Sequence, residues 1–213
     1  MNILTQFKNL LMESLSENKK LIIGLYALFI IVFIIAWIYS SSHATDMIST
    51  MQAANDTASS VGLSTSLSPV DLFIQNEGGG IVTYIASTFF GIFAILMIIY
   101  NAFNIGILGP IIGHFAPGGG LQYIIYLIPH GIFEITATIL QSVAGILLFM
   151  FVYKFIRAII GKETQGLSES FEVAKKPLIQ SLVIMIFAAI LLLIAAPIEA
   201  YLSVPISELF FGV

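Results

Sequence analysis

Long apolar runs separated by short polar segments dominate the chain. The runs 21–39 and 178–196 each reach the roughly 20 residues that an α-helix needs to cross the hydrocarbon core of a bilayer. A third apolar region extends from Ile81 to Tyr153 and is too long for one crossing. The pattern predicts an all-α protein, a polytopic transmembrane helix bundle that forms a single domain over residues 1–213.

Composition supports this class. Of the 213 residues, 58% are hydrophobic and only 9% are charged, and the mean hydropathy is +1.01. Soluble domains carry roughly 25% charged residues. There is no cysteine, so disulfides, thiolate nucleophiles and thiolate metal sites are excluded.

The basic residues indicate the orientation in the membrane. All eight fall in two places: Lys8, Lys19, Lys20, and Lys154, Arg157, Lys162, Lys175, Lys176. The positive-inside rule then predicts a cytoplasmic interfacial helix at 1–20, or a plain cytosolic helix end, and a cytoplasmic basic loop at 154–177. The acidic segment 40–80 is predicted as an outer loop. We therefore expect a multi-pass protein of the cell membrane with its N-terminus cytoplasmic and its C-terminus outside.

An outer residue 80 and an inner residue 154 require an odd number of crossings between them. Three fit the length: 81–100, a segment from about 102 to 127, and 130–153, which gives about five helices in all. The middle segment contains Gly106, Gly109, Pro110 and a glycine run at 118–120, so we expect a broken or re-entrant helix there. The alternative is two long helices, 81–113 and 121–153, with the basic loop outside.

A polar stripe follows the last of these crossings. At 100° per residue, one face carries His130, Glu134, Thr138, Gln141 and Gly145. An acid inside a bilayer is expected to face the bundle and find a partner, so we expect His130 and Glu134 to form a neutral, hydrogen-bonded pair.

Other helices carry further polar groups that could join or support this stripe. Glu199, near the outer end of the last helix, is predicted at the same depth as His130 and Glu134. Asn101 and Asn104 are candidates for tying helices together. A purely structural interpretation also fits: the stripe packs helices, Glu199 extends to the interface, and Pro129 occupies a first helical turn.

Three segments resemble the stage II sporulation protein M family. They are "LIPHGIFEITATILQSVAG", with Pro129, His130, Gly131 and Glu134, then "YNAFNIGILG", and "APIEAYLSVPI" with Glu199 and Pro205. Here Asn104 is followed by Ile105 before Gly106, where the family has Asn-Gly. The resemblance covers most of 81–205. It implies about five transmembrane helices and a scaffold in a membrane complex, and does not imply a hydrolase.

Three classes of function follow. The first is a non-enzymatic scaffold that positions membrane or envelope proteins; the second is a small transporter or channel with a polar site at His130, Glu134 and Glu199. The third, a metalloenzyme, is disfavoured because zinc sites need three protein ligands and the H-E-x-x-H pattern is absent. We expect no catalytic residue, metal or cofactor. Without a basic patch in 40–80, nucleic acid is not an expected partner; the glycines are compatible with a homodimer.

Overall fold

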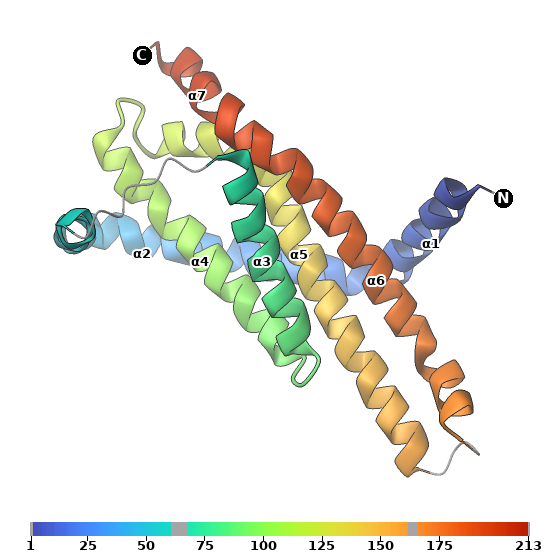
Figure 1. The fold of residues 1–213 in the computed structure, drawn as a ribbon. Coiled ribbons are helices and arrows are strands. Elements are labelled where there is room, and N and C mark those ends of the chain that lie inside the picture. Colours follow the sequence, from blue (N-terminus) through green and yellow to red (C-terminus); the bar gives the residue numbers. More distant parts are fainter. Residues whose placement is uncertain (1, 61–67, 162–165, 213) are drawn as a thin grey trace.

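The chain folds into helices throughout the described residues, which are 2–60, 68–161 and 166–212. The computed structural model contains no strand in this part of the chain (Figure 1), which confirms the all-α prediction. The elements are α1 Ile3–Glu17, α2 Lys19–Ser60, α3 Pro69–Ser87, α4 Ile92–Phe115, α5 Gly119–Ile160, α6 Leu167–Ile198, the π-helix η1 Glu199–Ser203, and α7 Val204–Phe211.

Four helical segments among the described residues are long and apolar enough to cross a membrane. They are Lys19–Thr50, Ile92–Phe115, Gly119–Ile160 and Leu167–Phe211. The last runs through α6, η1 and α7 without interruption. The chain is therefore a polytopic helical membrane protein.

The direction of each helix follows from its neighbours. Along α2 and α4, Phe33 lies against Gly106 and Trp37 against Gly109, so these two helices run the same way. The chain must return between them, and α3 makes this return, antiparallel to α4 and on the opposite side of the 88–91 turn. Figure 1 shows α3, α4, α5 and α6 lying along one another while α2 crosses at a large angle.

Small and branched residues form the core where α2, α4, α5 and α6 meet. Its fully enclosed members include Ile98, Ile139, Leu147, Ile184 and Leu192. Many large apolar side chains elsewhere are exposed, as expected of a surface solvated by lipid. The core fixes α5 in the middle of the bundle, so its polar stripe must face other helices.

The predicted crossing at 81–100 is wrong in its bounds. A turn at 88–91, closed by hydrogen bonds such as Phe93 N to Phe90 O, divides it between α3 and α4. Phe89 and Phe90 in the turn are apolar and exposed, so the hydropathy pattern runs through it without a break. The helix before the turn begins at Pro69, where Ser68 and Asp71 form a capping box.

The segment 40–80, expected as a loop, is largely helical. The helix α2 continues to Ser60 with non-helical backbone angles at His43, and α3 covers the end of the segment. Residues 61–67 lie outside the described residues. The same holds for 162–165 in the predicted basic loop of 154–177, on either side of which α5 and α6 are helical.

The predicted break at 102–127 lies in a narrower place. The helix α4 continues through Pro110, and neighbouring helices donate to nearby carbonyls: Ser40 Oγ bonds Ile107 O at 2.8 Å and Tyr123 OH bonds Ile105 O at 3.0 Å. The chain turns at 116–118, and the next residue, Gly119, has φ +63°, a conformation that glycine adopts readily. The alternative of two long helices, 81–113 and 121–153, was correct about the position of this turn. It was wrong about the start of the first helix, because α4 begins at Ile92.

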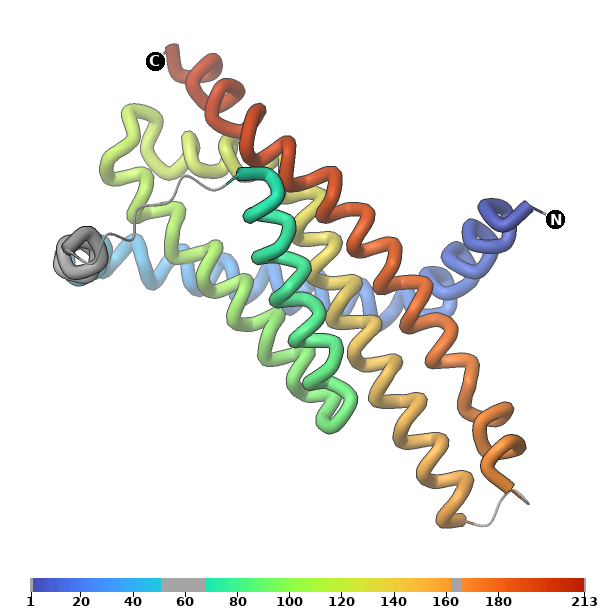
Figure 2. The backbone as a smooth tube through the Cα atoms, in the orientation of Figure 1, coloured from blue at the N-terminus to red at the C-terminus, as the bar shows by residue number. Residues whose placement is uncertain are grey.

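The fourth crossing begins earlier than predicted. The helix α5 starts at Gly119, so Pro129 lies inside it rather than in a first turn. Proline removes a backbone donor and clashes with the preceding turn, which bends a helix. Figure 2 shows the first turns of α5 running across the bundle before the helix turns to follow α6.

Candidate intramembrane polar site

His130, Glu134 and Glu199 converge between α5 and the π-helix η1. One ligand atom from each lies within 4.8 Å of the other two. His130 Nε2 is 3.9 Å from Glu134 Oε2, which is too long for the hydrogen-bonded pair expected from the sequence. His130 is 3% exposed, and the side chain of Glu134 is 21% exposed. The structure thus places these three side chains at one depth.

The π-helix positions both Glu199 and a second polar residue, Ser203. Its wider turn lets Ser203 Oγ donate to Ile198 O at 3.2 Å, while His130 Nδ1 lies 2.8 Å from the same hydroxyl. In the tautomer with its proton on Nδ1, the imidazole donates to Ser203 Oγ. The lone pair of Nε2 is then available on the side of Glu134, whose Oε2 lies 3.9 Å away.

The C-terminal half of the stripe faces a different helix, α3. Gln141 is almost fully buried and donates from Nε2 to Glu77 Oε2 of α3 at 3.0 Å. A side chain on Gly80 would collide with this glutamine, and Gly145 packs against Ser87. The stripe therefore divides, with His130 and Glu134 directed to η1 and the remainder to α3.

A polar cavity of about 200 Å³ lies between α3, α4 and α5. Glu134, Thr138 and Ser142 line it from α5, with Asn76 from α3 and Asn101 from α4. The hydroxyl of Ser142 is buried and has no hydrogen-bond partner among the described residues. Glu134 thus connects this cavity with His130 and Glu199.

The two asparagines of α4 do not join helices. Asn101 Nδ2 donates to Met97 O and Asn104 Nδ2 to Tyr100 O, each one turn back in the same helix. The expectation of inter-helix bonds is therefore wrong for both side chains. Their place in the fold is different: Asn101 lines the polar cavity, and Asn104 lines a pocket with the C-terminal half of α2.

Glycines of α4 bring α2 close. A Cβ on Gly106 would lie 2.6 Å from Phe33 O, and one on Gly109 would overlap the indole of Trp37. Gly91 and Gly145 are likewise in contact within the chain, against Phe149 and Ser87. These glycines thus allow close packing inside the bundle, and a homodimer stays a prediction.

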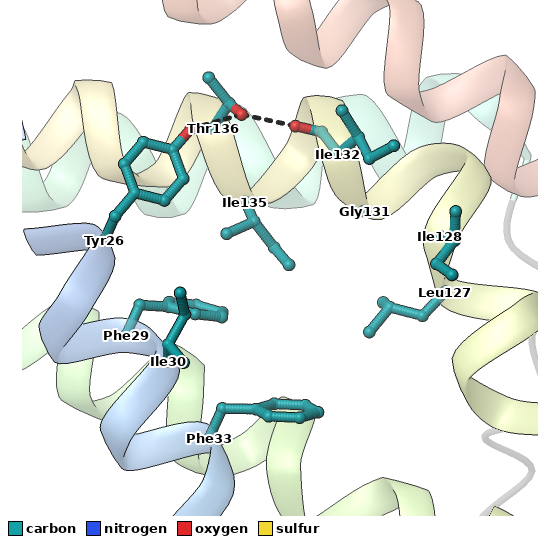
Figure 3. A pocket seen from close by; sticks show the side chains of 10 residues that line it. All are labelled: Tyr26, Phe29, Ile30, Phe33, Leu127, Ile128, Gly131, Ile132, Ile135 and Thr136. Atoms are coloured by element: carbon teal, nitrogen blue, oxygen red, sulfur yellow. Dashed lines mark hydrogen bonds between the residues drawn. The ribbon is translucent and has the colours of Figure 1, made fainter. Parts of the chain in front are cut away.

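An apolar crevice of about 480 Å³ separates α2 from α5 and is shown in Figure 3. Tyr26 OH donates to Thr136 Oγ1 at 2.6 Å, which satisfies both hydroxyls at its edge. The rest of the lining is aliphatic or aromatic, including Phe29, Phe33 and Ile132, together with Gly131, which has no side chain. We call this the α2–α5 crevice.

Three functional candidates escaped the sequence analysis. Glu77 was assigned to an outer loop, although its i+4 relation to Ile81 and the apolar residues beyond could have indicated a helix. Ser203 follows Glu199 at i+4, a spacing that would have placed it on the same face. Ser142 gave no signal, because buried serines are common in packed membrane helices.

The similarity to known proteins covers the residues of this site. The family described as stage II sporulation protein M matches residues 25–204. An uncharacterized protein of Methanocaldococcus jannaschii is 34% identical over 116 residues, which are 54% of this chain and 58% of the relative. The chain thus spans little more than half of that relative. No solved structure matches the chain.

Proposed function

Because the chain belongs to the stage II sporulation protein M family, we propose that it is a non-enzymatic membrane scaffold that binds partner proteins of the cell envelope. The observation that carries the proposal is the α2–α5 crevice. Its walls are apolar, its hydroxyls are paired with each other, and its size suits side chains of a further helix. We assign it to a transmembrane helix of a partner, since the family resemblance implies a membrane complex.

The orientation proposed is N-terminus cytoplasmic and C-terminus outside, in the cell membrane. Lys176 Nζ of α6 lies 2.6 Å from Glu17 Oε1, so the N-terminal basic region and the basic segment 154–177 share one side of the bundle. Five crossings, by α2, α3, α4, α5 and α6, are consistent with this shared side. Positive residues favour the cytoplasmic side for both.

Site-specific photo-crosslinking in native membranes tests the scaffold. A photoreactive side chain at Ile30 or Ile132, on opposite walls of the α2–α5 crevice, should give an adduct with the same partner protein. Ile186 on α6 is the matched control, since Ile30 and Ile186 are each 53% exposed. Ile135→Trp, which fills the crevice, should abolish both adducts. Adducts with lipid alone, or equal protein adducts from Ile186, would contradict the assignment.

A second candidate, a small transporter or channel, is favoured by the polar cavity. Its unpartnered Ser142 hydroxyl and the adjoining Glu134 are groups that water or a small solute would bind. The discriminating variant is Thr138→Cys in purified protein, because the chain has no other cysteine. Modification by a water-soluble thiol reagent from both sides of a proteoliposome would favour transport, and protection from both would count against it.

A further inference from the structure

We propose that His130, Glu134 and Glu199 form a binding site for one divalent metal ion of the zinc class. The inference goes beyond the scaffold and does not depend on it. It rests on three donor atoms from two helical segments that lie within 4.8 Å of one another. Among the described residues, this is the one group of three metal-ligating side chains that approach so closely.

The three donor atoms lie close enough together to approach one ion. With the imidazole proton on Nδ1, beside Ser203, the lone pair of His130 Nε2 is available to the carboxylates. A lone pair facing carboxylate oxygens is repulsive unless a proton or cation lies between them. Metal-bound histidines characteristically donate their other ring N–H to a fixed acceptor, and Ser203 supplies that acceptor here.

The separation of the donors favours an ion over a shared proton. A charge-assisted N–H to O hydrogen bond is about 2.7–2.9 Å long. Two ligands bound tetrahedrally at about 2.0–2.2 Å from zinc are about 3.3 Å apart. The 3.9 Å between His130 Nε2 and Glu134 Oε2 lies nearer the second value, and a shift of under about 1 Å would bring this pair to the spacing of two zinc ligands.

Charge supports a dication. With both glutamates ionised, the apolar bundle would hold two negative charges, which are strongly unfavourable there without a cation. Among the described residues no lysine or arginine forms an ion pair with either acid. On α5, Lys154 lies 20 residues beyond Glu134, about 30 Å along the helix, which is too far for an ion pair. One divalent ion would neutralise the pair.

Ligand chemistry selects the class of ion. Imidazole suits zinc and other transition metals, whereas calcium and magnesium prefer sites built only of oxygens. The neighbouring polar cavity reaches Glu134 and offers an entry path and room for a water ligand. The ring of Tyr126 stands edge-on to His130 with centroids 5.3 Å apart and packs against the imidazole.

Metal binding to the purified full chain tests the proposal. The protein, isolated in nanodiscs without a histidine tag and stripped by chelator, should bind one Zn²⁺ per chain and prefer it to Mn²⁺, Mg²⁺ and Ca²⁺. Glu134→Gln or Glu199→Gln should weaken Zn²⁺ at least about a hundredfold. Glu208→Gln, a glutamate of α7, is the matched control and should bind as wild type. Ser203→Ala should keep one ion per chain with affinity about 10–100-fold lower.

Absence of saturable Zn²⁺ binding to the wild-type chain would overturn the site, as would binding that survives both glutamine variants. Unchanged size-exclusion profile and helical circular dichroism establish that the variants are folded. If a glutamine variant does not fold, X-ray absorption of the zinc-loaded wild type decides: one imidazole nitrogen with oxygen ligands supports the site. Two or more imidazoles would indicate His43 or His114 instead and overturn it.

Discussion

At the scale of single residues, close helix contacts depend on glycines that leave no room for a side chain. Gly106 and Gly109 face α2, whereas Gly24, also within a helix, would place a Cβ in open space. The difference is set by the neighbouring helix and cannot be read from the glycine itself. Hydropathy therefore identified the glycine-rich helix but not which of its glycines are essential.

Gly106→Ala should destabilise the bundle by about 1–3 kcal/mol, because the new methyl group would meet the Phe33 carbonyl and force α2 and α4 apart. Gly24→Ala is the control and should cause no loss, since its Cβ meets nothing within 4 Å and alanine favours helix. The measurement is the free energy of unfolding in mixed micelles. Equal effects of the two substitutions would contradict the close α2–α4 contact.

A carboxylate outside the spanning segments links the N-terminal helix to α6. The hydrogen bond from Lys176, with a second from Gln180, lowers the pKa of Glu17 below its usual value. A lowered folded-state pKa means that the stabilisation is present above the unfolded pKa and is lost as the pH falls through the folded one. The attachment of α1 should thus be weaker in acid than at pH 7.

A spin label on Leu10→Cys should report this release as faster motion below about pH 4. Glu17→Gln should show the faster motion already at pH 7, because it keeps the shape of the side chain without its charge. Glu172→Gln, whose partner Lys175 lies on the same helix, is the control and should leave the label unaffected. Label motion that ignores both pH and the Glu17 substitution would disprove the link.

At the scale of elements, the sequence predicted the number and type of helices better than their ends. The 88–91 turn is lined by Phe89 and Phe90, so it has the hydropathy of a crossing. The helix α3 was not predicted, because its polar residues and three consecutive glycines at 78–80 are typical of a loop. Its helical conformation depends on packing beside α5, where Glu77 bonds Gln141, and this information is not local.

The candidate site was partly accessible by the same reasoning. Helical periodicity on one segment placed His130 with Glu134, and counting crossings placed Glu199 at their depth. The contribution of Ser203 depends on the π-helix, which changes the register of α6 by its wider turn. Neither hydropathy nor helical periodicity signals that change of register, so the contact of His130 Nδ1 with Ser203 could be found only from the structure.

At the scale of the whole molecule, the parallel directions of α2 and α4 require a return of the chain between them. The helix α3 brings the chain back from the end of α2 to the start of α4. It therefore belongs to the bundle, although it is not one of the four most apolar segments. In the proposed orientation, a crossing by α3 would make the number of crossings odd and leave both basic segments on one side of the membrane.

Sided cysteine labelling tests the arrangement in intact cells. Single cysteines at Lys8 and Phe90 should react only from the cytoplasmic side, and those at Asp71 and Glu208 only from outside. All four positions are exposed, and the natural chain contributes no cysteine. Phe90 and Asp71 reacting from the same side would show that α3 does not cross the membrane.

The central claim is that His130 of α5 and Glu199 of η1 act as one unit, and a double-mutant cycle measures it directly. The free energy of unfolding is compared for wild type, His130→Ala, Glu199→Gln and the double variant. A coupling of about 0.5–3 kcal/mol is expected, because donor atoms of the two side chains lie within 4.8 Å and each substitution changes the surroundings of the other residue. Effects that add within about 0.3–0.5 kcal/mol would place the two side chains apart and contradict it.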